Sequence, residues 1–157
     1  MERYLATPYG LSVLRNRLKA IKEVDRPQNV RDIEEARAHG DLSENAEYHA
    51  AKERQGLLDA ELRVLEDKIS RADVIDPSKL SGDRVVFGAT VDLVNTDNDE
   101  EVTYQIVGTD EADIKVGKIS YASPLGKAII GKEEGDEIAF QAPGGTRHYE
   151  VLDVRFA

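Results

Sequence analysis

The strongest pattern along the chain is a helical repeat of apolar residues in its first half. Apolar residues recur every three or four positions in two stretches, and charged residues fill the positions between them. The first stretch repeats at Leu11, Leu14, Leu18 and Ile21, and Ile33 and Ala36 resume the same face beyond Pro27. The second stretch repeats at Tyr48, Ala51, Gln55, Leu58, Leu62, Leu65, Ile69 and Ala72, of which only Gln55 is polar. Each stretch predicts a helix with one apolar side, and together they predict an antiparallel α-helical coiled-coil hairpin.

Local signals set the expected ends of the two helices. The first helix is predicted to run from about Pro8 to His39 with Thr7 as its N-cap, and the second from about Ser43 to Ala72. Pro27 lies inside the first repeat. Because proline has no backbone N–H, we expect a kink or local break near residues 25–28, with the hairpin continuing through it.

Beyond residue 77 the apolar residues alternate with polar ones, which is the spacing of strands. The predicted strands span residues 84–87, 90–94, 101–107, 113–119, 137–141 and 148–154. The segments 96–99 and 143–145 carry the Asp, Asn, Pro and Gly residues of hairpin turns.

One short helix interrupts the predicted strands. Ser123 suits the N-cap and Pro124 the first helical position, the helix continues from Leu125 to Ile130, and Gly131 ends it. We therefore expect an α+β protein. Its predicted parts are a coiled-coil domain at residues 1–76, a linker at 77–82 and a small, mostly antiparallel β-sheet domain with one short helix at 83–157.

Composition narrows the possible partners. The 157 residues include 31 acidic and 21 basic side chains, so the net charge is −10 and little affinity for free nucleic acid is expected. Cysteine is absent, which rules out disulfides and cysteine zinc sites. We see no long apolar run and no signal-peptide pattern, so we expect a soluble, cytoplasmic protein that has no membrane partner.

The turn between the two predicted helices carries the candidate chemistry. Gly40 suits the end of the first helix, and Asp41 with Glu44 has the form of a capping box for the second. The same two carboxylates are hard oxygen ligands of the kind that Mg²⁺ prefers, although they are too few to enclose the ion. The missing ligands would come from water, a phosphate or another protein, so the tip is suited to complete another protein's active site.

A small group of basic residues, Arg37, Lys52 and Arg54, lies close to this turn. Two interpretations stay open. These residues can form ion pairs with neighbouring acids, namely Glu34, Glu47 and Glu53. As a group they can also meet a phosphodiester backbone.

Several segments resemble the GreA/GreB family of bacterial transcript cleavage factors. The matching segments are residues 39–53, 86–91, 104–108, 123–127, 130–132 and 143–145, which follow the family's order and extend over essentially the entire chain. The resemblance implies an FKBP-like C-terminal domain that docks on the rim of the secondary channel of RNA polymerase. It also implies that the coiled coil reaches through this channel to the active centre.

The resemblance further implies roles for individual residues. Asp41 and Glu44 match the carboxylates that help hold the polymerase's second Mg²⁺ and its water during cleavage of the extruded 3′ end of a backtracked nascent RNA. The factor would be an accessory protein with no stably bound cofactor. Tyr48, Arg37 and Lys52 match positions that seat the RNA or the tip. The polymerase-docking segment would be Ser123, Pro124, Leu125, Gly126 and Lys127. An extended basic patch is missing, which favours the GreA branch and short cleavage products.

Three other functions are compatible with parts of the same sequence pattern. The same two-domain shape would suit an inhibitor of the secondary channel or a structural adaptor. An FKBP-like body would suit a prolyl isomerase or chaperone, but we expect no aromatic-lined pocket, because Phe occurs only at 87, 140 and 156 and Trp is absent. A self-contained metal site would use His39, Asp41, Glu44 and His49, although an exposed turn offers such a site no dry cavity.

Overall fold

The computed structural model describes residues 2–40 and 44–156 and divides into two compact units. Unit 1 consists mainly of residues 12–71, and unit 2 consists of residues 3–11 together with the chain from residue 72 onward. This division differs from the domains expected at residues 1–76 and 83–157, because the N-terminal segment folds with the C-terminal half. Each unit is described by itself.

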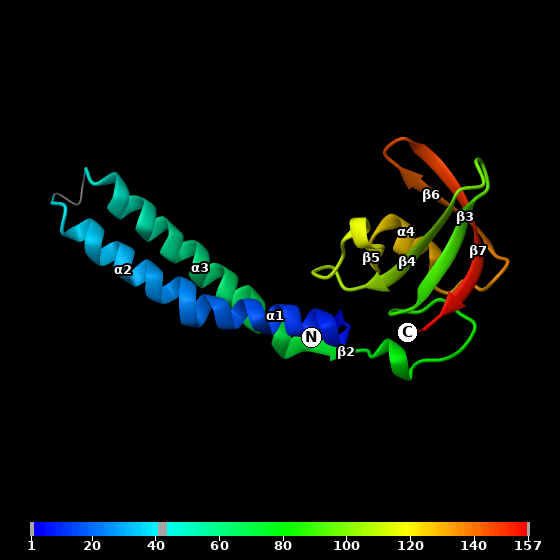
Figure 1. Ribbon diagram of the computed structural model, residues 1–157, viewed down its shortest axis with the longest axis horizontal. Helices are drawn as coiled ribbons and strands as arrows, with labels where there is room; N and C mark the ends of the chain where they lie inside the picture. The colour runs from blue at the N-terminus through cyan, green and yellow to red at the C-terminus, as the bar shows by residue number, and fades with distance from the viewer. Residues whose placement is uncertain (1, 41–43, 157) are drawn as a thin grey trace. The chain divides into compact units, whose positions relative to one another are not determined.

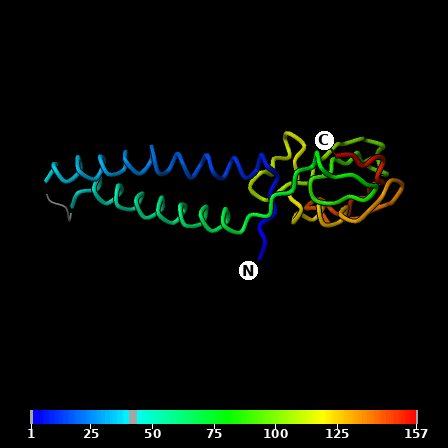
Figure 2. The backbone as a smooth tube through the Cα atoms, turned by 90° about the horizontal axis from the view of Figure 1, so that it is seen from below, coloured from blue at the N-terminus to red at the C-terminus, as the bar shows by residue number. Residues whose placement is uncertain are grey.

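Unit 1 is a helical hairpin, as predicted (Figures 1 and 2). Its first arm is made of α1 (Pro8–Ala20), a π-helical turn (Ile21–Asp25) and α2 (Arg26–Arg37). Its second arm is α3 (Ala46–Arg71), which runs beside the first arm in both views. Within the described residues, no helix has the length and apolar composition needed to cross a bilayer.

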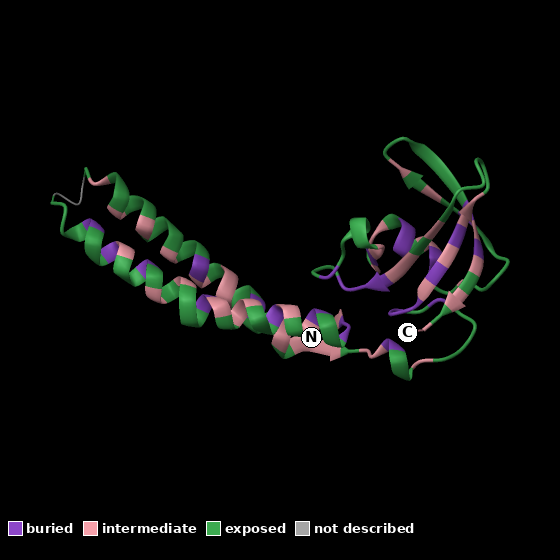
Figure 3. Cartoon of the chain, viewed as in Figure 1, coloured by how far each residue is buried: buried purple, intermediate pink, exposed green. Residues whose placement is uncertain are grey.

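The predicted apolar repeat forms the contact between the two arms (Figure 3). Every residue of the repeat is buried or half-buried in the structure. The fully buried ones are Leu14, Ile21, Ile33, Ala36, Leu58 and Leu65. Two helices bury only one stripe each, so this line of side chains forms the apolar core of the described part of the hairpin.

Pro27 is accommodated without ending the helix. The irregular segment is the π-helical turn Ile21–Asp25, where the Arg26 N–H donates to the Ile21 carbonyl five residues earlier. It therefore lies one turn before the position expected at 25–28. A proline removes a hydrogen bond to the carbonyl four residues before it and its ring crowds that carbonyl, so the disturbance falls in the preceding turn.

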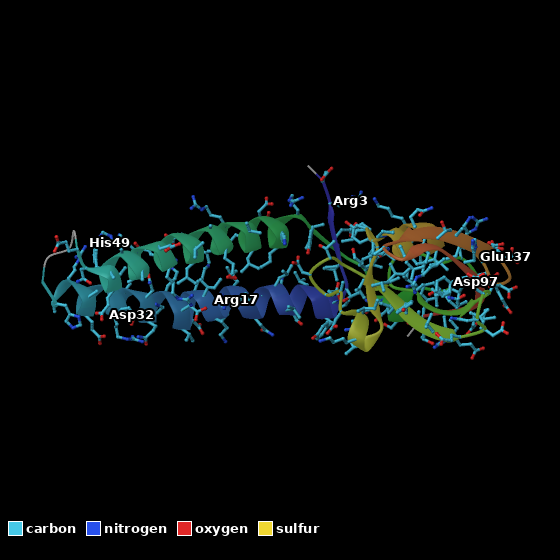
Figure 4. The ribbon with its side chains drawn as sticks, turned by 90° about the horizontal axis from the view of Figure 1, so that it is seen from above. Arg3, Arg17, Asp32, His49, Asp97 and Glu137 are labelled. Carbon is cyan, nitrogen blue, oxygen red and sulfur yellow. The ribbon has the colours of Figure 1, made fainter. Side chains whose placement is uncertain are left out.

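Arg17 connects the π-helical turn to the opposite arm (Figure 4). Its guanidinium donates one hydrogen bond to Asp25 (2.8 Å) and two to Glu61 (2.8 Å each). The bonds from Arg17 hold the pKa of the Glu61 carboxyl below its usual range, although partial burial works against this shift. The three side chains are partly exposed, so we expect this link to contribute less than about 1 kcal/mol and to act mainly on alignment.

A buried asparagine interrupts the apolar contact between the arms. Asn29 is 2% exposed, and its side-chain amide donates to the Ala51 carbonyl on the opposite helix (2.9 Å). A polar group buried in such a contact costs free energy unless its partner is in place. One alignment of the two helices provides that partner, so Asn29 favours this register over shifted ones.

Unit 2 is built on a five-stranded sheet with the strand order β5-β4-β3-β7-β6. The strands are β3 (Thr90–Asn95), β4 (Glu101–Val107), β5 (Lys118–Ser120), β6 (Glu137–Ala142) and β7 (Gly145–Arg155). Neighbouring strands are antiparallel except for β4 and β5, which are parallel. The hairpin turns expected at 96–99 and 143–145 are confirmed, because they join β3 to β4 and β6 to β7.

Two of the predicted strands are wrong in whole or in part. Residues 84–87 form no strand, because their backbone groups bond to the segment after α4 instead of forming a ladder, and only Arg84 makes a bridge to Glu133. The strand expected at 113–119 is reduced to β5. Asp113 caps a 3₁₀ turn (Ile114–Val116) that breaks the extended chain before β5.

The short helix α4 (Pro124–Ile129) covers the core of unit 2 and confirms its predicted cap. The Ser123 hydroxyl accepts a hydrogen bond from the Gly126 N–H (3.0 Å), and Gly131 has a φ of +89° just after the helix. The buried core residues are Val85, Phe87, Ala89, Val91, Leu93, Ile106, Ile119, Leu125, Ile129, Ile138, Tyr149 and Val151. The non-strand residues Val85 and Phe87 belong to this core while Val86 between them is exposed, which explains why residues 84–87 alternate like a strand.

Two strands of three residues each were not predicted from the sequence. β1 (Tyr4–Ala6) pairs in parallel with β2 (Ala72–Val74), and the Ile75 N–H donates to the Ala6 carbonyl (2.9 Å). A strand this short offers too few positions for an alternating pattern to be recognised. The pairing explains why residues 3–11 belong to unit 2.

A buried carboxylate completes this attachment of the N-terminal segment. Glu111 is 7% exposed, and it accepts hydrogen bonds from the Thr7 N–H (3.0 Å), from the Thr7 hydroxyl and from the Gly108 N–H (3.2 Å). Thr7 also caps α1, as predicted, because its hydroxyl accepts a bond from the Gly10 N–H (3.1 Å). A Cβ at Gly10 would overlap the Glu111 carboxyl group, so glycine is needed there.

One polar network on the sheet generates a pH-dependent prediction. Asp92 accepts hydrogen bonds from Arg155 and from the Thr103 hydroxyl (2.6 Å), and the Arg155 bond is the main reason why the pKa of Asp92 is lowered. We expect Asp92→Asn to reduce the free energy of unfolding by about 0.5–1 kcal/mol at neutral pH. Since the folded-state pKa lies below the unfolded one, this difference is complete above about pH 4 and disappears as the pH falls further. Urea unfolding of both proteins from pH 7 to pH 3 measures it, and a difference that grows on acidification would contradict the assignment.

A second prediction concerns the buried amide of the hairpin. Asn29→Ala removes the hydrogen bond to Ala51 and leaves a small void, so we expect the free energy of unfolding to fall by about 1–2 kcal/mol. Asn16→Ala is the matched control, because Asn16 is an exposed residue of α1. Equal urea midpoints for the two variants would show that Asn29 has no part in holding the helices together.

Candidate functional site

The helical hairpin turns after α2. This helix ends at Arg37, two residues before the predicted end at His39, and the His39 N–H then donates to the Ala36 carbonyl (3.1 Å). Gly40 has a φ of +117°, a conformation that residues with a side chain rarely adopt, so its predicted role at the helix end is confirmed. Asp41 and Ser43 lie outside the described residues.

Asn45 organises the other side of the turn. Its side-chain oxygen accepts a hydrogen bond from the Tyr48 N–H (3.0 Å), which makes it the N-cap of α3, and its amide donates to the Ala36 carbonyl of α2 (2.6 Å). The helix therefore begins at Ala46 and not near Ser43. Sequence reasoning missed this role because it assigned the cap to Asp41, although asparagine is among the preferred N-cap residues.

Glu44, one of the two predicted metal-assisting carboxylates, is exposed and precedes α3. It borders a shallow cavity of about 360 Å³ that is also lined by His39, Asn45, Ala46 and Glu47. His39 Nδ1 and a Glu47 carboxylate oxygen are 2.8 Å apart, so these two side chains pair with each other across the turn. Among residues 2–40 and 44–156, no three His, Asp or Glu side chains are grouped closely enough to hold a metal ion.

The predicted positioning residues have different surroundings. The guanidinium carbon of Arg37 lies 5.9 Å from the centre of the Tyr48 ring, and the ring of His49 meets the Tyr48 ring edge-on at 5.7 Å. Lys52 is exposed and donates to the Gln55 side chain (2.8 Å). Within the described part of the hairpin, the expected ion pairs of Arg37 and Lys52 with neighbouring acids are not formed, and Glu47 pairs with His39 instead.

In unit 2, part of the predicted docking segment borders a cavity of about 520 Å³. Ser123, Pro124 and Leu125 line this cavity. Gly126 is buried beneath it, and a Cβ there would overlap the Ser120 carbonyl. Lys127 is exposed and lies outside the lining.

The same cavity is lined with aromatic rings, which corrects the expectation that no such pocket exists. Tyr104, Phe140 and Tyr149 contribute to its wall, and the last two rings are stacked with their centres 5.8 Å apart. Burial is the main cause that raises the pKa of Tyr104, with the neighbouring Tyr149 adding to it and Arg147 opposing it. The expectation rested on the scarcity of phenylalanine and tryptophan. Two of these three rings are tyrosines, which come from the two strands β4 and β7.

Comparisons with known proteins agree over both units. Residues 4–74 match the family model described as "Transcription elongation factor, N-terminal", and residues 80–156 match "Transcription elongation factor, GreA/GreB, C-term". Transcription elongation factor GreA of Rhodospirillum rubrum is 60% identical over 156 residues, and that of Brucella anthropi is 54% identical over 156 residues, with 99% of both chains covered in each case. Among solved structures, the chain is similar to GreA factor homolog 1 (Gfh1) of Thermus thermophilus, with 28% identity over 98% of this chain and 99% of that chain and a TM-score of 0.44. This chain belongs to the GreA/GreB family of transcription elongation factors.

Proposed function

We propose that this elongation factor binds RNA polymerase in the bacterial cytoplasm and stimulates the polymerase to cleave the 3′ end of a backtracked nascent RNA. The hairpin would enter the secondary channel and present its tip to the active centre. The observation that carries this proposal is the exposed Glu44 carboxylate at the turn of a hairpin whose register is held by Asn29 and Asn45. Membership of the GreA/GreB family supports it.

The tip can supply some, but not all, of the oxygen ligands of a Mg²⁺ ion shared with the polymerase. Glu44 is exposed, and Asp41 lies three residues before it in the sequence. Carboxylate oxygens are ligands that Mg²⁺ accepts, and the ion usually keeps several waters and takes one or two carboxylates. When bound in the polymerase active centre, such an ion lowers the pKa of a bound water and stabilises developing charge on the phosphate. The factor itself is then an accessory protein, and the polymerase performs the hydrolysis.

The other tip residues would orient the tip and the RNA. Asn45 fixes the point at which α3 begins, directly after the exposed Glu44. Arg37 holds its guanidinium against one face of Tyr48, so a positive charge and an aromatic ring lie together beside the turn. Such a pair is suited to a phosphate and a stacked base at the RNA end. Lys52 supplies a further exposed positive charge one turn along α3.

Unit 2 would provide the docking surface for polymerase. The Ser123 cap fixes the backbone at the start of α4. The side chains of Ser123, Pro124 and Leu125 border the open, mostly apolar cavity. Apolar cavities with a few polar groups are common binding sites. Gly126 and Lys127 complete the segment, the first by allowing close packing and the second as an exposed charge beside the cavity.

The first experiment measures RNA shortening in a deliberately backtracked elongation complex with Mg²⁺ present. We expect the wild-type protein to accelerate cleavage, and we expect Asp41→Asn and Glu44→Gln each to reduce the stimulated rate at least about tenfold. Both substitutions remove a metal-directed charge and keep a polar side chain of similar size. Polymerase binding and thermal unfolding of both variants should stay close to those of the wild-type protein.

Glu35→Gln is the matched control, because Glu35 is an exposed acid of α2 outside the proposed site. Its cleavage rate should equal that of the wild-type protein. Full activity of Asp41→Asn would remove the tip carboxylates from the mechanism. Slower elongation with no shortening of the RNA, for wild type and variants alike, would favour the alternative of a channel inhibitor or adaptor.

A separate prediction tests the Arg37–Tyr48 pair. Tyr48→Phe keeps the ring under the guanidinium, whereas Tyr48→Ala removes it. We therefore expect Tyr48→Ala to lower the maximal stimulated cleavage rate by about twofold to fivefold, as loss of one exposed cation–π contact implies, and Tyr48→Phe to retain the wild-type rate. Equal losses in both variants would assign the effect to the hydroxyl group instead of the ring.

A further inference from the structure

One polar contact crosses the turn of the hairpin in addition to the bonds of Asn45. His39 follows the end of α2, Glu47 lies in the first turn of α3, and His39 Nδ1 is 2.8 Å from a Glu47 carboxylate oxygen. An ionised carboxylate can only accept a hydrogen bond, so the imidazole Nδ1–H is the donor. The bond joins residues eight positions apart and thereby closes a short loop that contains Glu44.

This pair contributes little to the stability of the hairpin. The side chains of His39 and Glu47 are 61% and 71% exposed, and pairs in such contact with water add little to the free energy of unfolding. The N-cap of α3 is Asn45, whose amide also ties α3 to the Ala36 carbonyl. Loss of the pair would therefore leave the two helices and their register in place.

The pair acts on a smaller scale, beside the exposed Glu44. His39, Glu44 and Glu47 all line the shallow cavity at the turn. The Glu44 carboxylate bonds to no other residue in the described part of the chain, whereas the Glu47 carboxylate is engaged by His39. His39 thus distinguishes the two carboxylates of one cavity, because it holds one within the chain and leaves the other able to meet a ligand outside it.

We propose that His39 and Glu47 are positioning residues, and that the hydrogen bond between them holds Glu44 where its carboxylate meets the polymerase active centre. The inference rests on the proposed cleavage function and adds a pair that lies outside the predicted metal ligands. Neither side chain needs to touch Mg²⁺ or RNA. Without the bond the Glu44 backbone samples more conformations, and fewer of them place the carboxylate correctly.

A set of full-length variants separates the hydrogen bond from the charge of Glu47. His39→Asn keeps an N–H donor near the position of Nδ1, and Glu47→Gln keeps an acceptor without the negative charge. His39→Ala and Glu47→Ala each remove the bond, and the double alanine variant removes both partners. Glu53→Ala is the matched control, because Glu53 is an exposed acid of α3 outside the cavity lining.

The first measurement uses each protein without polymerase and without Mg²⁺. NMR relaxation gives the order parameter of the Glu44 backbone amide, which is about 0.85 for a rigid backbone and below about 0.6 for a flexible one. We expect the alanine variants of His39 and Glu47 to lower this order parameter, and His39→Asn, Glu47→Gln and Glu53→Ala to keep the wild-type value. An unchanged order parameter in the alanine variants would contradict the proposed positioning.

The second measurement is the maximal rate of stimulated RNA cleavage in a backtracked complex at saturating factor. We expect His39→Ala and Glu47→Ala each to lower this rate by about threefold to tenfold, and the double alanine variant to show the same loss, because the two residues act through one bond. His39→Asn, Glu47→Gln and the control should retain the wild-type rate. Affinity for polymerase and thermal unfolding should be unchanged in all variants, which a merely structural role would not predict.

Three other outcomes overturn the proposal. If Glu47→Gln is as slow as Glu47→Ala, the charge of Glu47 itself acts in the reaction, and the positioning role is wrong. If the losses of the two single alanine variants add up in the double variant, His39 and Glu47 act separately. If the wild-type protein accelerates no cleavage, the proposed function fails and the assigned role fails with it, even where the order parameters show that the pair holds Glu44.

Discussion

Two helices packed against each other share only one buried face, and the register of that face determines where everything on the hairpin lies. Apolar side chains alone would tolerate a shift of one turn, because leucine and isoleucine fill similar spaces in either alignment. The polar contacts do not tolerate it. Asn29 reaches the Ala51 carbonyl, Asn45 reaches the Ala36 carbonyl, and Arg17 spans from the π-helical turn to Glu61. Each of these bonds exists in one register only, and the described residues on either side of the turn take their positions from that register.

The sequence was most informative where structure depends on local spacing. Every residue named in the repeat from Leu11 to Ala72 is buried or half-buried in the structure, as the spacing predicts. Thr7 and Ser123 were recognised as N-caps because a cap requires only a side-chain acceptor at one position and free N–H groups three residues later. The exposed carboxylate of Glu44 could be predicted in the same way, since a polar turn between two amphipathic helices has nothing of its own chain to cover it.

Contacts between distant residues were not predictable in this way. Residues 84–87 alternate like a strand because Val85 and Phe87 enter the core, but their backbone partners lie near residue 131 and do not extend into a ladder. The aromatic wall of the cavity combines rings from β4, β6 and β7, so the residue spacing within any one segment could not predict it. Asn29 looked like one more polar residue beside the apolar repeat. Its burial depends on which carbonyl the opposite helix presents, and this is a property of the assembled pair.

The attachment of the N-terminal segment also has a consequence for the order in which the protein can fold during synthesis. Thr7 bonds to a carboxylate that comes 104 residues later in the chain, and β1 pairs with a strand that follows the whole hairpin. The hairpin contains only residues up to the end of α3, so it can fold while the rest of the chain is still being synthesised. Within residues 3–11, β1 can pair with β2 once residue 75 has been made, but Thr7 lacks its acceptor until Glu111 is synthesised. A nascent chain stopped before Glu111 could therefore hold a folded hairpin and a paired β1, with Thr7 still lacking its carboxylate partner.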